Sequence, residues 1–186
     1  MAVLGRNLSA MILGTLWLAA SMPLAHGAEG PTEYQVKAVF LYNFSHFVEW
    51  PAQAFGTPND AFDICVLGND PFGTHLDDAI KGEQINQHPL SVRRIRDVAD
   101  ANSCSLLYID RSKATELPQI LTVLDHRAIL TVSEQDGSAE RGVMIQFTTE
   151  NNRIRLRINV ESARSAGLTI SSKLLRPAEI VPTAKE

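Results

Sequence analysis

The chain has 186 residues, with 17 Lys and Arg against 21 Asp and Glu and a formal net charge of −4 at pH 7. This length accommodates one domain, or one domain behind a removable leader. The mildly acidic balance argues against a general nucleic-acid-binding protein, because such a protein needs an excess of positive charge.

Residues 1–27 have the pattern of a secretory signal peptide. Arg6 supplies a short positive start, and the stretch 8–20 (LSAMILGTLWLAA) is apolar, uncharged and too short to cross a bilayer comfortably. Ala25 and Gly27 are the small residues that a signal peptidase needs, so we expect cleavage after Gly27 and an exported domain over residues 28–186. A retained N-terminal anchor is the alternative.

Export changes the interpretation of the two cysteines. In an oxidising compartment a minimal, even number of cysteines indicates a disulfide, so we expect Cys65 and Cys104 to be paired. Two buried free thiols are the alternative. A metal site is less well supported, because neither cysteine has a CxxC or CxxH spacing.

The first element of the exported domain is predicted to be a helix from about Glu33 to Trp50. Thr32 and Gln35 fit a capping box at its start, and Pro51 stops it. It carries five aromatic side chains: Phe40, Tyr42, Phe44, Phe47 and Trp50.

A helix that is apolar on most sides is normally packed between a sheet and another element, so a core position is the leading interpretation of this helix. A membrane span is excluded, because Lys37, Asn43, His46 and Glu49 interrupt the apolar run. A partly exposed aromatic patch that needs a partner stays open, and it would involve Tyr42, Phe47 or Trp50.

The next part of the chain alternates between strands and helices. Such alternation implies right-handed βαβ crossovers and a parallel sheet. If the strand order begins second–first–third, Cys65 and Cys104 lie on neighbouring strands, and the topology and disulfide predictions support each other. The predicted elements are strands over 62–67, 90–95, 105–109 and 128–132, helices over 70–81 and 116–124, and a helical turn over 97–101.

The end of the chain has a different pattern. Segments 143–149 and 153–160 flank the tight turn Glu150-Asn151-Asn152, which predicts an antiparallel hairpin, and residues 162–180 read as a closing helix interrupted around Gly167. The expected fold class is therefore α/β: a single compact domain whose mostly parallel sheet is built from βαβ units, with a C-terminal antiparallel hairpin and a closing helix.

Catalytic and metal sites are poorly supported. His46 and Glu49 have a spacing that can hold a metal on a helix, but no third ligand is visible. No GxSxG elbow is present, and the loop 68–73 (GNDPFG) is neither GxGxxG nor a Walker loop. We therefore predict no catalytic residue, metal or cofactor, and rank an exported hydrolase with an unrecognised nucleophile last.

The most informative polar feature is the strict alternation in 153–158 (RIRLRI). Period two places Arg153, Arg155 and Arg157 on one face of a strand. One interpretation is a solvated face whose charge prevents edge aggregation. The other is a surface that binds an anion or an acidic partner, which Arg164, Lys173 and Arg176 could enlarge.

Two blocks of the sequence resemble a known family, the YfiR-like periplasmic regulators. Together they extend over nearly all of the exported domain. The first block is 37–44 (KAVFLYNF), 47–51 (FVEWP) and 65–73 (CVLGNDPFG). The second is 129–133 (ILTVS), Gly142, 158–160 (INV), Ala163-Arg164, 166–168 (AGL) and 170–176 (ISSKLLR).

The resemblance implies a compact α/β protein of the periplasm that is not an enzyme. The best-known member represses an inner-membrane diguanylate cyclase by docking on its periplasmic sensor domain, which lowers cyclic di-GMP and biofilm formation. An outer-membrane lipoprotein can sequester it, and oxidation of family disulfides affects repression. That member has two disulfides, whereas only one pair is possible here, so redox control through a second bridge does not carry over. Related domains are attached to histidine kinases, so the partner enzyme stays open, as does a homodimer.

The leading hypothesis is a signalling regulator that docks on such a sensor domain. The alternative is a ligand-binding module, in which Arg153, Arg155 and Arg157 hold an anionic metabolite or nucleotide at the C-terminal ends of the parallel strands. The residues expected to contact a partner are Glu161, Arg164, Leu168, Lys173 and Arg176.

Overall fold

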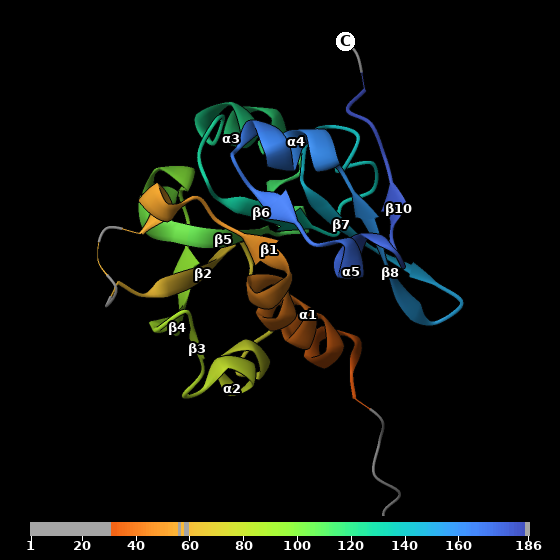
Figure 1. Cartoon of the computed structure of the whole chain (residues 1–186). Helices are drawn as coiled ribbons and strands as arrows, with labels where there is room; N and C mark the ends of the chain where they lie inside the picture. Colours follow the sequence, from red (N-terminus) through yellow and green to blue (C-terminus); the bar gives the residue numbers. More distant parts are fainter. Residues whose placement is uncertain (1–30, 56, 58–59, 185–186) are drawn as a thin grey trace, which may run out of the picture. The chain divides into compact units, whose positions relative to one another are not determined.

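The computed structural model of the chain describes residues 31–55, 57 and 60–184 (Figure 1). These residues form an eight-stranded sheet of order β10-β8-β7-β6-β5-β2-β4-β3 and a two-stranded sheet, β1-β9. The predicted α/β class, with a mostly parallel sheet and a C-terminal hairpin, is confirmed. The signal peptide predicted over residues 1–27 lies outside the described residues.

The strands of the larger sheet are β2 (Phe62–Leu67), β3 (Gln84–Ile85), β4 (His88–Ile95), β5 (Cys104–Ile109), β6 (Leu130–Ser133), β7 (Ile145–Glu150), β8 (Arg153–Ile158) and β10 (Glu179–Ile180); β1 (Val48–Glu49) and β9 (Thr169–Ile170) form the smaller one. The α-helices are α1 (Glu33–Phe47), α2 (His75–Ile80), α3 (Leu117–Val123), α4 (Val160–Ser165) and α5 (Ser172–Leu175). Short 3-10 helices are η1 (Ala52–Ala54), η2 (Val98–Ser103) and η3 (Arg111–Lys113).

The centre of the sheet has the predicted topology. β2 pairs in parallel with both β4 and β5, which gives the second–first–third order, and β5, β6 and β7 continue in parallel. Cys65 and Cys104 form a disulfide between the neighbouring strands β2 and β5, with Cα atoms 5.9 Å apart. The predicted pairing is therefore confirmed.

Strict alternation of side chains divides the sheet into two faces. On the first face, Ile64 and Val66 of β2 join a large apolar cluster that contains Phe44 of α1. On the second face, Cys65 and Leu67 join a smaller cluster that contains residues of α3. The sheet is thus covered on both faces, as a parallel sheet requires.

Helix α1 begins where the sequence predicts but ends earlier. Thr32 and Gln35 form the capping box, with the Gln35 side chain accepting from the Thr32 N–H at 2.6 Å. The predicted extension to Trp50 is wrong, because Val48 and Glu49 leave the helix and pair antiparallel with Ile170 and Thr169. Of the helices described, none is long and apolar enough to cross a membrane.

Two predicted boundaries in the first half also change. The helix predicted over 70–81 is limited to α2, because Asp70 instead caps a turn by accepting from the Phe72 N–H and Gly73 then adopts φ +54°. The strand predicted over 90–95 is longer and starts with an unpredicted hairpin to β3. Asn86 and Gln87 turn this hairpin with φ of 50° and 73°, as a primed two-residue turn requires.

The single closing helix predicted over 162–180 is wrong. Gly167, at φ +74°, ends α4, since its N–H donates to Arg164 O and the Leu168 N–H donates to Ala163 O. This is a Schellman motif, which terminates a helix rather than kinking it. Thr169 then enters β9, and the rest of the segment forms α5 and β10.

The disulfide is expected to contribute strongly to stability. It closes a separation of 39 residues between two buried side chains. Replacing both cysteines by Ala should lower the free energy of unfolding by up to about 4 kcal/mol, because the unfolded chain regains loop entropy. Urea unfolding of the oxidised protein and of the double variant would measure this loss, and equal midpoints would contradict it.

Candidate functional site

The predicted arginine face exists on β8. Ile154, Leu156 and Ile158 point into the large apolar cluster, so the alternate residues Arg153, Arg155 and Arg157 point to the second face of the sheet. Their partners across the β7–β8 hairpin are, in order, Glu150, Thr148 and Gln146. The second face therefore changes from apolar at its centre to cationic on β8.

Arg157 is structural. Its guanidinium lies 2.5 Å from Glu140 Oε1 and donates to both carboxylate oxygens of Glu179 at 3.1 Å. The hydrogen bonds to Glu179 raise the pKa of Arg157, and the same bonds lower the pKa of the Glu179 carboxyl. Since Glu179 belongs to β10, these bonds attach the last strand of the sheet to β8.

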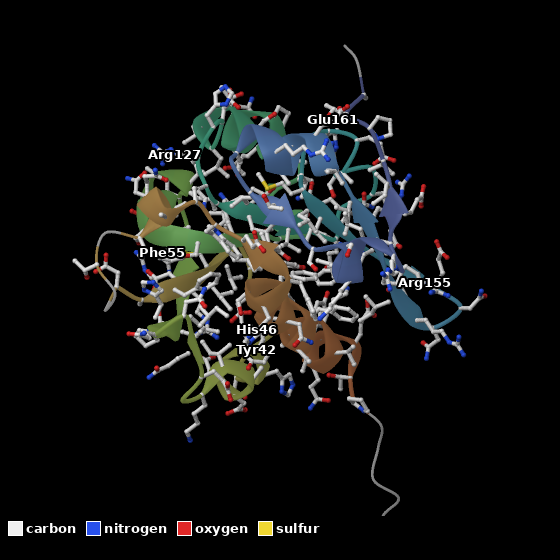
Figure 2. All side chains as sticks on the ribbon, viewed as in Figure 1. Tyr42, His46, Phe55, Arg127, Arg155 and Glu161 are labelled. Atoms are coloured by element: carbon white, nitrogen blue, oxygen red, sulfur yellow. A yellow bond between two sulfur atoms is a disulfide. The ribbon has the colours of Figure 1, made fainter. Side chains whose placement is uncertain are left out.

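Arg153 and Arg155 differ from Arg157. Both are exposed, and neither guanidinium has a hydrogen bond or ion pair with another residue that the structure describes. Figure 2 shows Arg155 beside β8, away from α4. These two cations are available to an anionic group.

The residues predicted to contact a partner occupy two short helices and the link between them. Glu161 and Arg164 are exposed on α4, and Lys173 and Arg176 are exposed on and just after α5. Leu168 is only 1% exposed and belongs to the large apolar cluster. It therefore supports this segment from inside and has no surface to offer a partner.

The structure does not gather these charges into one patch. Figure 2 shows Glu161 and Arg155 well separated. Leu174 of α5 joins the apolar cluster on the first face, whereas Arg153 and Arg155 lie on the second. The cations of α5 and of β8 thus flank the β8–β10 edge of the sheet from opposite sides.

Glu161 lines a groove. It has a volume of about 320 Å³ and lies between the C-terminal end of α3 and α4. Leu121, Leu124 and Met144 give it an apolar lining, and Asp125 and Glu161 are its carboxylates. Glu161 is thus part of a concave surface with negative charge.

The arginine strand is remote from the usual ligand position of this topology. Doubly wound sheets bind ligands where the strand order reverses, which here is between β2 and β5. Strands β6 and β7 lie between β5 and β8. At the reversal point, Ser112 Oγ accepts from the Asn69 N–H and would lie 2.6 Å from a Cβ at Gly68, so this loop is closely packed. The alternative hypothesis placed the three arginines of β8 at this crevice, but the strand order separates β8 from the crevice.

The weakly supported metal spacing does not form. His46 is on α1, but Glu49 is on β1, so they do not share a helix face. Among the residues that the structure describes, no group of three or more His, Cys, Asp and Glu side chains could hold a metal ion.

The aromatic residues of the first helix are mostly packed. Phe44 is fully buried and stacks on Phe147 with ring centroids 5.8 Å apart. Tyr42, Phe47 and Trp50 are half-buried and lie against the same cluster. The core interpretation is thus supported, because the fold partly covers each of these three rings.

The sequence did not reveal a buried charge cluster that links α1 to the end of β6. Lys37 and Glu134 are 2% and 3% exposed, and they form an ion pair. The Tyr34 hydroxyl donates to Glu134 Oε1 at 2.9 Å, and Glu33 Oε1 lies 2.6 Å from Lys37 Nζ. Arg111 approaches Glu134 from the surface, at 3.3 Å.

Contacts within this cluster shift the pKa values of Tyr34 and Glu33. Burial, followed by the hydrogen bond to Glu134, raises the pKa of Tyr34 to about 12. The contact with Lys37 lowers the pKa of the Glu33 carboxyl. The available signal was a lysine inside an apolar helix, but its partner is 97 residues away and no local pattern identifies it.

The chain matches a protein family over most of its length. A family model described as DUF4154, YfiR/HmsC-like, matches residues 34–179. No curated protein matches the chain. The matched region extends from the first turn of α1 into β10.

Removing one member of the buried pair should be costly. Lys37→Met leaves Glu134 buried without its main cation, so we expect the free energy of unfolding to fall by roughly 3 kcal/mol or more. The double variant Lys37→Met/Glu134→Leu removes both charges and should recover most of that loss. Urea unfolding of the wild type, of Lys37→Met, of Glu134→Leu and of the double variant measures the coupling, with Lys173→Met as an exposed control. Additive losses would contradict the proposed pairing.

The Glu33 contact predicts a pH dependence. Because the folded pKa of Glu33 is lowered, its contribution to stability is present above its unfolded pKa of about 4.3 and is lost as the pH falls through the folded pKa. Glu33→Gln should therefore weaken the fall in stability between about pH 5 and pH 3. Unfolding midpoints over this range, with Glu161→Gln as an exposed control, give the comparison. Identical pH profiles for wild type and Glu33→Gln would contradict it.

Proposed function

The chain belongs to the YfiR/HmsC-like family, and from this membership we propose that it is a periplasmic signalling regulator that binds the sensor domain of an inner-membrane enzyme. The enzyme we propose is a diguanylate cyclase, which the bound regulator represses, so that cyclic di-GMP falls. Export through the signal peptide over 1–27 is part of this proposal. An outer-membrane lipoprotein that sequesters the regulator, and a homodimer, are consistent with it.

The supporting observation is a set of exposed cations that have no partner among the described residues of an acidic protein. Other arginines of the fold are neutralised by carboxylates, among them Arg94, which donates to Asp70 and Asp77. Exposed, unneutralised cations steer association with an acidic surface and select the partner. Between residues 153 and 176 these cations are Arg153, Arg155, Arg164, Lys173 and Arg176.

Repression by binding requires differential affinity. A regulator without a reaction of its own can shift a two-state enzyme only if it binds the inactive arrangement more tightly than the active one. Moving the equilibrium from 1:99 to 99:1 needs about 5.5 kcal/mol of such preference. Short, rigidly held elements suit this task, since α4 and α5 are each tied to the core by a buried side chain, Ala163 and Leu174.

Cyclic di-GMP gives the first test. Deleting the gene in a cell that expresses the cognate cyclase should raise the cyclic di-GMP concentration, and complementation with the wild-type chain should lower it again. An unchanged concentration, with the cyclase shown to be present, rules out the regulator.

Charge reversal gives the second test. The triple variant Arg164→Glu, Lys173→Glu and Arg176→Glu should bind the purified sensor domain at least about tenfold more weakly, because each reversal opposes an acidic partner. Lys81→Glu is the matched control, since Lys81 is exposed, has no described side-chain partner and follows α2. Equal affinities of the triple variant and the control would remove these residues from the interface.

A further inference from the structure

The outer edge of β8 is only partly covered. β10 pairs with Arg157 and Ile158 alone, at the C-terminal end of β8. Within the described part of the chain, residues 153–156 are therefore paired with β7 on one side and with no strand on the other. Figure 1 shows the β7–β8 hairpin projecting past β10 at this edge.

Two hydrogen bonds establish which backbone groups face outward. Ile158 O accepts from the Val181 N–H on the outer side, and the Asn159 N–H donates to Met144 O on the β7 side. Backbone polar groups of a strand alternate between its two edges. Ile154 therefore directs its N–H and C=O outward, and Arg153 and Arg155 direct theirs toward β7.

A groove with a partly apolar lining lies beside this free edge. It has a volume of about 320 Å³ and is lined by Val36 and Phe40 of α1 and by Ile154 of β8. Val39, one of the few large apolar side chains that are strongly exposed, is 49% exposed one helical turn after Val36. The groove therefore lies on the first face of the sheet and is open to an apolar side chain.

The charge at this edge selects the occupant. Arg153 borders the groove at the hairpin, its side chain and that of Arg155 point to the second face, and neither has a described partner. Glu33 also lines the groove, but its carboxylate already forms an ion pair with Lys37 and accepts a hydrogen bond from the Thr149 hydroxyl. A second copy of this chain would bring its own arginines to the same edge, so homotypic pairing is opposed by repulsion.

We propose that the outer edge of β8 accepts an extended acidic segment of the partner as an added strand. The segment pairs with the backbone of Ile154, places acidic side chains beside Arg153 and Arg155, and directs an apolar side chain into the groove formed by Val36 and Phe40. Alternation along the added strand sends these two kinds of side chain to opposite faces, which is how strand addition combines affinity with specificity. The proposal rests on the proposed function for the identity of the partner, but not for the chemistry of the edge.

Hydrogen exchange with two peptide probes tests the edge directly. The mature chain is mixed with a peptide of the pattern Glu-Val-Glu-Val-Glu or with its counterpart Lys-Val-Lys-Val-Lys, and backbone amide exchange is followed by NMR. The acidic peptide should slow exchange at Ile154 and shift the resonances of Arg153 and Arg155, and the basic peptide should do neither. No protection at Ile154 with the acidic peptide, or equal protection with both, overturns the proposal.

Two proline variants separate the edge from the fold. Ile154→Pro removes an outward N–H and keeps the ladder to β7, whereas Arg155→Pro removes a ladder N–H and should destabilise the hairpin. Ile154→Pro should bind the acidic peptide about five- to tenfold more weakly, and its Tm is measured in parallel because the Ile154 side chain packs against the large apolar cluster. If its Tm falls, Arg153→Glu/Arg155→Glu, which keeps the backbone intact, replaces it and should abolish binding.

The outcomes distinguish this inference from the proposed function. If the sensor domain binds the wild type and both edge variants equally, while the charge reversals on α4 and α5 weaken binding, the regulator stands and the edge proposal fails. If the sensor domain does not bind but the acidic peptide protects Ile154, the edge stands and the assigned partner fails. If Ile154→Pro converts a dimer to a monomer in sedimentation, a second copy is the occupant and the acidic-segment proposal is overturned.

Discussion

The buried ion pair between Lys37 and Glu134 is the constraint on which the position of α1 depends. An unpaired charge in this core would cost several kcal/mol, so Lys37 can be buried only where Glu134 meets it. That requirement fixes both the rotation of α1 and its position along the sheet. Tyr34 and Glu33 complete the coordination of the two charges, and the rings of α1 then reach Phe147 on β7.

The alternation of side chains across the sheet distributes the remaining roles. One face carries apolar residues from β2 to β8 and receives α1, whereas the other changes from apolar at β2 to cationic at β8. The transition follows from coverage, since the second apolar cluster contains side chains of α3 but none of β8. Arginine side chains are compatible with the second face at β8 because they do not enter this apolar cluster. Leu67 on β2 does enter it, so an apolar side chain is required there. Packing and the proposed partner binding therefore use different side chains of β8.

Local signals predicted much of the fold, and long-range pairing explains where they were insufficient. The capping box at Thr32, the strand order and the Cys65–Cys104 bridge could be inferred because each rests on nearby residues or on a general rule of topology. The end of α1 and the structure of the closing segment could not be inferred, because β1 and β9 form strands only by pairing with each other. For the candidate site, the alternation predicted the arginine face, but only the structure shows that Glu140 and Glu179 neutralise Arg157 and that Leu168 is buried.

The small β1–β9 sheet has a consequence for how the chain reaches its native state. It joins the end of the first helix to a segment near the end of the chain, and the Ser171 N–H adds a bond to Phe47 O at 2.8 Å. Contacts of such high sequence separation must wait for loop closure, which slows folding. A chain that emerges from a translocation channel with its N-terminus first would hold the aromatic surface of α1 incomplete until its last segment is released. Folding is therefore completed only when the last segment becomes available, and under the proposed export a chaperone that shields apolar surface would act in that interval.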